Sequence, residues 1–505
     1  PLLPPELWIY IFHLATSPSH PFLSSSIVTP STPISFMEYP SSHSHLIPQY
    51  NAAMAFKCSL THVCRLWHDL MQEVLFEFVW ITKGKDASRI VELLDARAFT
   101  YPFDTRSVGR HIRRIHIETP PRELCSPQDI IRLVELSPGL VIFSDFQSIR
   151  RNPTFHIFST PLRDSDCHQA ADHRVLSALL DPPHRDPGLR RLSWTNYDYE
   201  NGDYEAGMRY YLRVFGPKIE RAQDRLEFLE LTLSKSSVGA APLHLPALRS
   251  LKVTLDNITF AVLASWDIPV LQNLSVISAD FSYAGDGFAQ FFISHGEKIV
   301  QLELGHSSGE VEEFWIAGGP GANDGTNQTP HTLPAIATWL PNLKQLIVSA
   351  DAEWDWQNPN VIAPHVLIPS HPTLDFIGIR DLQRRIYEGL ERVEARDADR
   401  LARGGKPDAL PPPDAPPVEG FDPWFALIAQ FSGLAQREAF PKLKYIRDLS
   451  WESGAMRNDG NWRRVGSLWI RVVKMCRDNK VWLEDCAGVN ITFGSLWRVE
   501  QEVKV

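Results

Sequence analysis

Histidine and cysteine are the side chains through which this sequence could bind a metal ion or attack a substrate. The chain contains 18 histidines and 6 cysteines, and the cysteines are scattered without a Cys-x-x-Cys pair. Thiolate zinc sites usually place two cysteines about two to four residues apart, so this spacing argues against one. The tripeptide His43-Ser44-His45 could chelate a metal weakly, but no further clear ligands accompany it. We therefore expect no metal site.

Motifs for nucleophilic catalysis and for phosphate binding are missing from the sequence. No Gly-x-Ser-x-Gly elbow occurs, and no pairing of histidine with serine or cysteine is recognisable. The glycine-rich run at residues 318–325 lacks the Lys-Ser/Thr pair of a phosphate-binding loop. We therefore predict no catalytic residues and no cofactor, and we expect that the chain is not an enzyme.

Composition and charge restrict the class of protein further. The 505 residues are 44% hydrophobic and 22% charged, with a formal charge of −10. An acidic chain is poorly suited to displacing counterions from a nucleic acid, so we expect no nucleic-acid partner. No apolar stretch reaches the length of about 18 to 20 residues that a membrane span needs, so we expect no membrane insertion. Scattered cysteines fit reduced thiols, which favours the cytoplasm or the nucleus.

One local pattern recurs between residues 112 and 381. A leucine or isoleucine at position zero is followed by apolar residues three and five places further on. Two further segments, at residues 140–145 and 443–448, carry an aspartate at position five. The full pattern occurs in eight segments, whose position zero is Ile112, Leu189, Leu226, Leu248, Leu271, Ile299, Leu343 and Leu374.

Helix-like runs precede several of these segments, for example at residues 126–136, 332–340 and 423–434. A two-residue apolar period indicates strands, and its alternation with helices indicates an α/β protein. Successive first positions at 226, 248, 271 and 299 are separated by 22, 23 and 28 residues. Such an irregular period predicts an array of degenerate strand-helix repeats that form a solenoid.

The first 82 residues have a different pattern, with two helical stretches separated by an insertion. Apolar residues lie at helical spacing in residues 5–14 and again in residues 56–75. Between them, residues 17–51 are rich in serine and proline, and we call this segment the insertion. We expect the insertion to be mobile and to loop out, because its prolines prevent long regular elements.

Two motifs near the N-terminus resemble the F-box family. The first is L-P-P-E-L at residues 3–7, followed by Ile11 and Phe12, and the second is V-C-R-L-W at residues 63–67. Leu75 and Trp80 follow, where the family has its closing residues. The resemblance covers residues 3–81, and the insertion stands where the family usually has a short connection.

Resemblance to the F-box implies a binding partner. F-boxes bind the Skp-type adaptor of cullin-RING ubiquitin ligases, while the rest of the chain selects a protein substrate. Apolar anchors of such an interface would be its hot spots. The alternative is that these residues only pack against the repeat region. By resemblance, the adaptor-binding residues are Leu3, Pro4, Leu7, Ile11, Phe12, Val63, Cys64, Trp67 and Trp80.

The repeat region resembles the irregular leucine-rich repeats that are often joined to F-boxes in fungal proteins. In such a solenoid, positions three and five point into the core, and positions two, four and six line the concave face. The alternative is a solvated polar face without a partner. From this face and from loops after strands, we expect a substrate to contact Arg114, His116, Phe228, Glu230, Lys252, Ser275, Glu303, Gln345, Trp354 and Trp356.

These observations predict four regions. Residues 1–82 form the F-box-like helical module with its insertion, residues 83–403 the repeat solenoid, residues 404–420 a proline-rich linker, and residues 421–505 a terminal repeat and cap. The expected function is that of a substrate-recognition adaptor in a cullin-RING ligase of the SCF type. The alternative is a leucine-rich-repeat scaffold for protein interactions without a ligase role.

Overall fold

The structure is a computed structural model, and it divides the chain into two compact units, Pro1–Asn273 and Leu274–Val505. No helix in the described residues is long and apolar enough to cross a membrane. The described residues are 3–18, 20–23, 32–40, 43–100, 108–150, 171–180, 188–195, 215–232, 242–255, 257–278, 286–306, 336–350, 368–405, 422–458 and 462–496.

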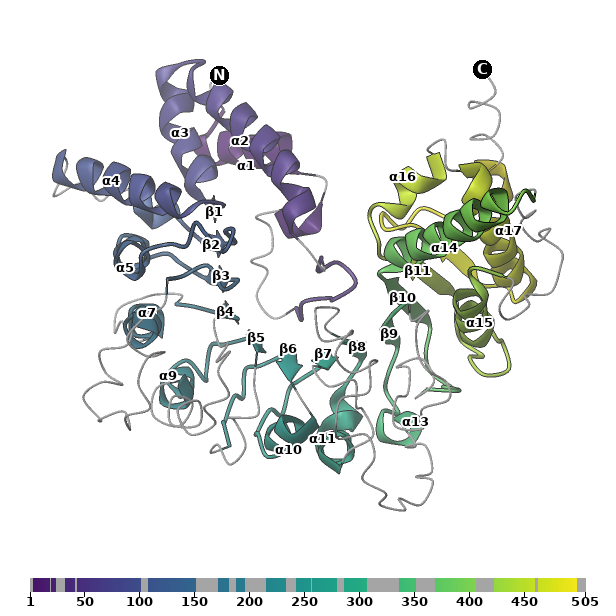
Figure 1. Ribbon diagram of the computed structural model, residues 1–505. Coiled ribbons are helices and arrows are strands. Elements are labelled where there is room, and N and C mark those ends of the chain that lie inside the picture. The colour runs from purple at the N-terminus through teal and green to yellow at the C-terminus, as the bar shows by residue number, and fades with distance from the viewer. Residues whose placement is uncertain are drawn as a thin grey trace. The chain divides into compact units, whose positions relative to one another are not determined.

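A parallel sheet organises both units (Figure 1). Its twelve strands follow one another in chain order, from β1 to β12. Parallel neighbours need a crossover connection, and helices supply many of these crossovers. The chain is therefore a mixed α/β protein with an open parallel sheet, as the pattern of strands and helices predicted. An open sheet of this order fits a solenoid-like arrangement.

The first unit begins with three helices and continues with alternating strands and helices. Short 3-10 turns occur at Pro21–Leu23, Ser44–Leu46 and Val108–His111. The helices are α1 (Pro5–Thr16), α2 (Ile47–Thr61), α3 (Arg65–Phe76), α4 (Gly84–Thr100), α5 (Pro127–Glu135), α7 (Ala171–Leu180), α9 (Gly216–Glu220) and α10 (Asn257–Ala264). The strands are β1 (Phe78–Ile81), β2 (Arg114–Ile117), β3 (Ile142–Asp145), β4 (Arg191–Trp194), β5 (Phe228–Thr232) and β6 (Ser250–Leu255).

Strand β7 (Asn273–Ser278) starts at the last residue of the first unit. The second unit has its own strands and helices. The strands are β8 (Gln301–His306), β9 (Gln345–Ser349), β10 (Phe376–Arg380), β11 (Tyr445–Asp448) and β12 (Trp482–Glu484). The helices are α11 (Asp286–His295), α13 (Ile336–Trp339), α14 (Leu382–Ala402), α15 (Phe425–Leu434), α16 (Ser453–Asn458) and α17 (Trp462–Asp478).

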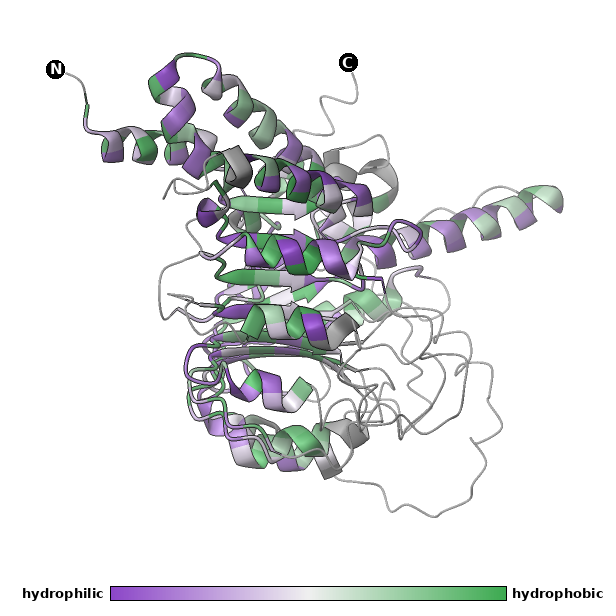
Figure 2. Ribbon diagram, turned by 90° about the vertical axis from the view of Figure 1, so that its left-hand side faces the viewer, coloured by the Kyte–Doolittle hydropathy of each residue, from purple (hydrophilic) through white to green (hydrophobic). Residues whose placement is uncertain are grey.

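All ten segments that follow the leucine pattern, including the two with aspartate, contain a strand. In the segment of β6, Leu248, Leu251 and Val253 are fully buried, as the pattern requires of positions zero, three and five. The register pairs equivalent positions of neighbouring repeats, such as Leu229 with Leu251. Figure 2 shows strands of mixed hydropathy beside helices that are also mixed, and mixed helices are typical of amphipathic helices covering a sheet.

The two aspartates at position five are buried because they organise the turn after their strand. The backbone N–H of Ser148 donates to Asp145 Oδ1 over 3.1 Å. In β11, the N–H of Ser450 donates to Asp448 Oδ1 over 2.9 Å, and the Ser453 hydroxyl donates to the same carboxylate. Burial raises the pKa of Asp448 to about 6. A carboxylate therefore replaces the usual apolar side chain where it can accept hydrogen bonds from the turn.

The three N-terminal helices pack around an aromatic centre. Trp8 and Phe12 of α1 meet Trp67 of α3, with ring centroids 5.3 and 5.0 Å from that ring. Met71 and Val74 belong to the same cluster and are fully buried, and Leu60 of α2 packs against it. The helical module thus has an apolar core of its own.

Residues 32–40 of the insertion lie on the sheet of the first unit and do not loop away from it (Figure 1). The N–H of Ile34 donates to Ser250 Oγ over 2.8 Å, and Asn273 Nδ2 donates to the Ile34 carbonyl over 2.7 Å. Phe36 and Tyr39 are buried in this contact. The expectation of a looped-out insertion is therefore wrong for residues 32–40, because their aromatic side chains find cover on the sheet.

Candidate docking surface and the covered sheet face

An apolar stripe on α1 is exposed to solvent. Leu7 is 47% exposed and Ile11 is 40% exposed, while Leu3 precedes them at the start of the helix and is also exposed. The spacing of residues 7, 10, 11 and 14 places their side chains on one face of the helix. The opposite face carries Trp8 and Phe12, which belong to the aromatic centre. Helix α1 is therefore apolar on both faces, and one face lacks a covering element within the described residues.

The turn between α2 and α3 presents a second group of exposed apolar residues. Val63 is 59% exposed, and Cys64 and Leu66 are exposed beside it in sequence. Cys64 is the N-cap residue of α3 and has extended backbone angles. Eight of the fifteen large apolar side chains exposed in the described residues belong to the helical module, so exposure of this kind is concentrated there.

Three residues that the F-box resemblance assigns to adaptor binding are not exposed. Phe12 is buried in the aromatic centre, and Trp67 is half-buried against it. Trp80 lies on β1 and is buried, with its ring 4.8 Å from that of His116. The six others, Leu3, Pro4, Leu7, Ile11, Val63 and Cys64, are exposed.

Sequence reasoning missed four exposed apolar residues of the module. Tyr10 and Leu14 extend the α1 stripe, Phe56 lies on α2, and Leu66 lies on α3. The spacing of Tyr10 and Leu14 from Leu7 could have identified them, because residues three and seven places along a helix share its face.

The insertion covers the predicted substrate face of the first unit. Arg114 donates to the carbonyl of Phe22, and its guanidinium stands 4.2 Å from the centres of the Phe22 and Phe78 rings. Burial lowers the pKa of Arg114 to about 10. The Phe228 ring packs against Phe36 of the insertion, with centroids 6.5 Å apart. These predicted substrate contacts are therefore buried by the chain itself.

Glu230 forms a polar contact between the insertion and the sheet. The Tyr39 hydroxyl donates to Glu230 Oε2 over 2.7 Å, and Lys252 Nζ lies 2.9 Å from Oε1. Burial alone would raise the pKa of Glu230, but the Lys252 ammonium and these hydrogen bonds outweigh it and hold the pKa below its usual value. The carboxylate is thus ionised and fully engaged while the insertion is docked.

A cavity of about 330 Å³ remains between the insertion and the sheet. Arg114 and Arg191 line it from the strands, and Ile34 and Tyr39 line it from the insertion. The sheet face is therefore covered without being completely filled.

In the second unit, the predicted substrate residues Ser275, Glu303 and Gln345 bond to other side chains of the sheet. The Ser275 hydroxyl donates to Glu303 Oε2 over 2.6 Å, and Arg380 pairs with the same carboxylate. Gln345 accepts a hydrogen bond from the Gln301 amide. Trp354 and Trp356 lie outside the described residues.

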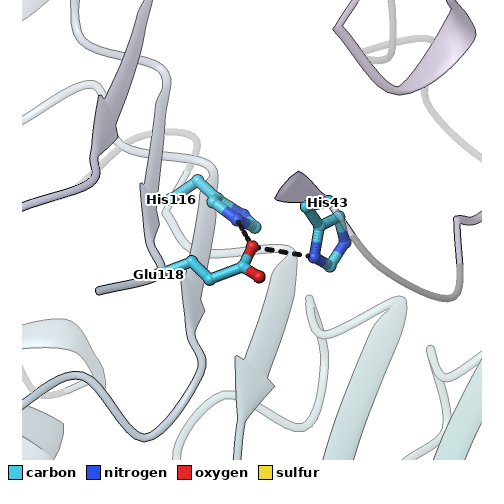
Figure 3. A group of neighbouring side chains, drawn as sticks. All are labelled: His43, His116 and Glu118. Atoms are coloured by element: carbon cyan, nitrogen blue, oxygen red, sulfur yellow. Dashed lines mark hydrogen bonds and ion pairs between the residues drawn. The ribbon is translucent and has the colours of Figure 1, made fainter. Parts of the chain in front are cut away.

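A cluster of two histidines and a glutamate lies at the edge of the covered face (Figure 3). His43 Nδ1 and His116 Nε2 stand 3.1 and 3.2 Å from Glu118 Oε2. Burial lowers the pKa of His43 and lowers that of His116 to about 3. Burial raises the pKa of Glu118, but hydrogen bonds from both rings bring it down to about 2.

The cluster differs from the sequence pattern that suggested weak chelation. His45 does not join it; the His45 ring lies near that of His20, with centroids 6.2 Å apart. His43 meets His116 and Glu118 because the docked insertion brings it to the end of β2. Sequence spacing could not show this grouping, since about seventy positions separate its members.

Comparison with known proteins adds no family assignment. The chain matches no protein-family model, and no curated protein is significantly similar to it.

Proposed function

We propose that this chain is a substrate-recognition adaptor of an SCF-type cullin-RING ubiquitin ligase. The helical module at residues 1–82 binds the Skp-type adaptor, which connects it to the cullin, and the repeat region binds a protein substrate. Function in such a protein is proximity, because the chain brings two partners together and performs no chemistry itself.

The observation that carries this proposal is the exposed apolar stripe of α1. Leu7 and Ile11 belong to the motif that resembles an F-box, and both are exposed although the module has a complete aromatic centre. Exposed apolar residues concentrated on one small helical unit are characteristic of a protein interface. The resemblance in sequence and the exposure in the structure thus favour the same surface.

The insertion limits the access of a substrate to the sheet face of the first unit. Tyr39 of the insertion contacts Glu230 of β5 and Lys252 of β6, two residues that we expect to contact a substrate. A substrate that uses Glu230 or Lys252 must therefore displace this part of the insertion. We propose that substrate binding at the first-unit face is coupled to undocking of the insertion.

The test is a binding measurement between the purified chain and a Skp-type adaptor of its host. The double variant Leu7→Ala, Ile11→Ala removes two exposed anchors, whereas Trp67 is unsuitable because it packs in the aromatic centre. Each truncation should cost about 1 kcal/mol of interface burial, so the pair should weaken binding about 30-fold. Leu401→Ala, an exposed leucine of α14, is the matched control and should leave the affinity unchanged.

A folded wild-type chain that does not bind the adaptor would overturn the ligase proposal and favour the repeat scaffold. Equal loss of affinity in the double variant and the Leu401→Ala control would show that α1 is not the docking surface. Circular dichroism of each variant verifies that the helices are intact.

A further inference from the structure

Two buried imidazoles and a carboxylate converge on one point of the first unit. The ring nitrogens His43 Nδ1 and His116 Nε2 both face Glu118 Oε2, at 3.1 and 3.2 Å (Figure 3). All three potential ligand atoms lie within 4.8 Å of one another. His43 and His116 are only 4% and 0% exposed, so this convergence is not a chance meeting of surface side chains.

Two separate segments supply these groups. His116 belongs to β2, and Glu118 follows directly after that strand. His43 belongs to the insertion and immediately precedes the 3-10 turn Ser44–Leu46. The set is therefore complete only while the insertion is docked on the sheet.

Aromatic side chains enclose the two imidazoles. The His43 ring lies 4.6 Å from the Phe22 ring and 4.8 Å from the Phe146 ring, and the His116 ring lies 4.8 Å from the Trp80 ring. In the described part of the chain, the far nitrogens His43 Nε2 and His116 Nδ1 have no hydrogen-bond partner. The glutamate is thus the polar group toward which both rings are directed.

Imidazole nitrogen and carboxylate oxygen are preferred ligands of Zn²⁺. A tetrahedral ion bonded at about 2.0 to 2.1 Å places its ligand atoms about 3.4 Å apart. The two nitrogen–oxygen separations are already close to this value, so binding requires mainly that the two ring nitrogens approach each other. Glu118 retains 31% side-chain exposure, which leaves room for water as a fourth ligand.

We propose that His43, His116 and Glu118 bind a Zn²⁺ ion that fastens the insertion to β2. The ion takes the place of the two hydrogen bonds to Glu118 Oε2, and the proton of each ring moves to its far nitrogen. Because the docked insertion is needed for the complete ligand set, metal binding and docking stabilise each other. This inference is independent of adaptor binding by the α1 stripe.

The first experiment measures Zn²⁺ binding to the full chain after treatment with a chelator, by calorimetry and by competition with a chromogenic chelator. One tight equivalent is expected. Replacement by Co²⁺ should give the intense visible absorption of a four-coordinate ion, in contrast to the weak bands of the hydrated ion. Absence of a tight equivalent in the folded wild-type chain would overturn the proposal.

Variants then identify the ligands. His43→Asn and Glu118→Gln each remove one ligand while retaining a polar side chain of similar size. Loss of groups that merely support a ligand weakens metal binding about 10- to 100-fold, so loss of a ligand should weaken it at least ~100-fold. His45→Asn is the matched control from the same segment and should bind as the wild type does. Equal loss in His45→Asn and His43→Asn would assign the ion to the His43-Ser44-His45 tripeptide and contradict the proposed ligand set.

Hydrogen exchange at Ile34 provides a second readout, because its N–H is bonded to Ser250 only in the docked state. Zn²⁺ at 100 times its dissociation constant should lower the equilibrium constant for opening of the insertion, and with it the exchange rate of the Ile34 amide, about 100-fold in the wild type and not in His43→Asn. Unchanged exchange in the metal-bound wild type would overturn the fastening role.

Discussion

Tyr39→Phe tests how the insertion is attached to the sheet. The substitution removes only the hydroxyl, which donates to Glu230 Oε2 over 2.7 Å in a buried contact. The Tyr39 ring also packs against Phe228, with centroids 6.0 Å apart, and phenylalanine preserves this packing. Lys252 stays paired with Glu230. The change is therefore confined to the polar contacts of this hydroxyl, with Glu230 and with Ser193.

The expected magnitude follows from the charge and burial of the acceptor. A hydrogen bond to an ionised buried group contributes about 1.5 to 3 kcal/mol. Since 1.4 kcal/mol corresponds to a factor of ten, the equilibrium for undocking of residues 32–40 should increase about 10- to 100-fold. Global stability should change less than local docking if the sheet stays folded when the insertion opens.

Hydrogen exchange measured by NMR or mass spectrometry reads this equilibrium. The Ile34 amide, which donates to Ser250 Oγ, should exchange about 10- to 100-fold faster in Tyr39→Phe. Amides of β10 should be unaffected. Tyr387→Phe, at an exposed tyrosine of α14, is the control and should leave both regions unchanged. Unchanged Ile34 exchange in Tyr39→Phe would refute the attachment of the insertion through Glu230.

Two further predictions concern pH and packing. Burial lowers the pKa of His20 to about 4 and that of His116 to about 3. As the pH falls, the unfolded chain therefore binds protons at these histidines first, near pH 6.5. The free energy of unfolding should fall as the pH drops from about 6.5 toward 4. Urea unfolding with a chelator present checks this, and equal stability at pH 7 and pH 5 would contradict it. Gly389→Ala should destabilise the second unit by about 1 to 3 kcal/mol despite the higher helix propensity of alanine, because its Cβ would lie 2.3 Å from Trp424 Nε1. Gly433→Ala, at a helical site with open space, should instead be neutral or stabilising in the same thermal unfolding assay.

The strands could be predicted from the sequence because their burial follows a short local period. Leu251 and Val253 repeat the spacing of Leu229 and Leu231, and the register pairs them across β5 and β6. Strand β1 was not identified, because Trp80 also fits the closing position of the F-box motif. A bulky apolar residue satisfies both patterns, and only the pairing with β2 decides between them.

Docking of the insertion could not be predicted from local pattern. Its contacts join residues very distant in sequence, 191 positions apart for Tyr39 with Glu230 and 239 for Ile34 with Asn273. Serine and proline suggested a loop, while Phe36 and Tyr39 supplied the apolar surface that holds it on the sheet. The same contacts bring His43 to His116, so the histidine cluster could not be predicted from the sequence either.

The candidate docking surface could be predicted only in part. The spacing of Leu7 and Ile11 on α1 indicated a shared helix face, and both are exposed. The same motif also includes Phe12, and the second motif includes Trp67; both side chains belong to the module's own core. A sequence motif contains both core residues and surface residues of a module. The exposure of each side chain in the structure is needed to tell the two apart.

Hydrogen-exchange footprinting of the chain with and without a Skp-type adaptor tests the proposed function most directly. Adaptor binding should protect amides of α1 and of the turn from α2 to α3, around Leu7, Ile11 and Val63, and should leave α14 unchanged. A complex whose protected amides lie elsewhere, or a folded chain that forms no complex with the adaptor, would contradict the assignment of this helical module as the docking site.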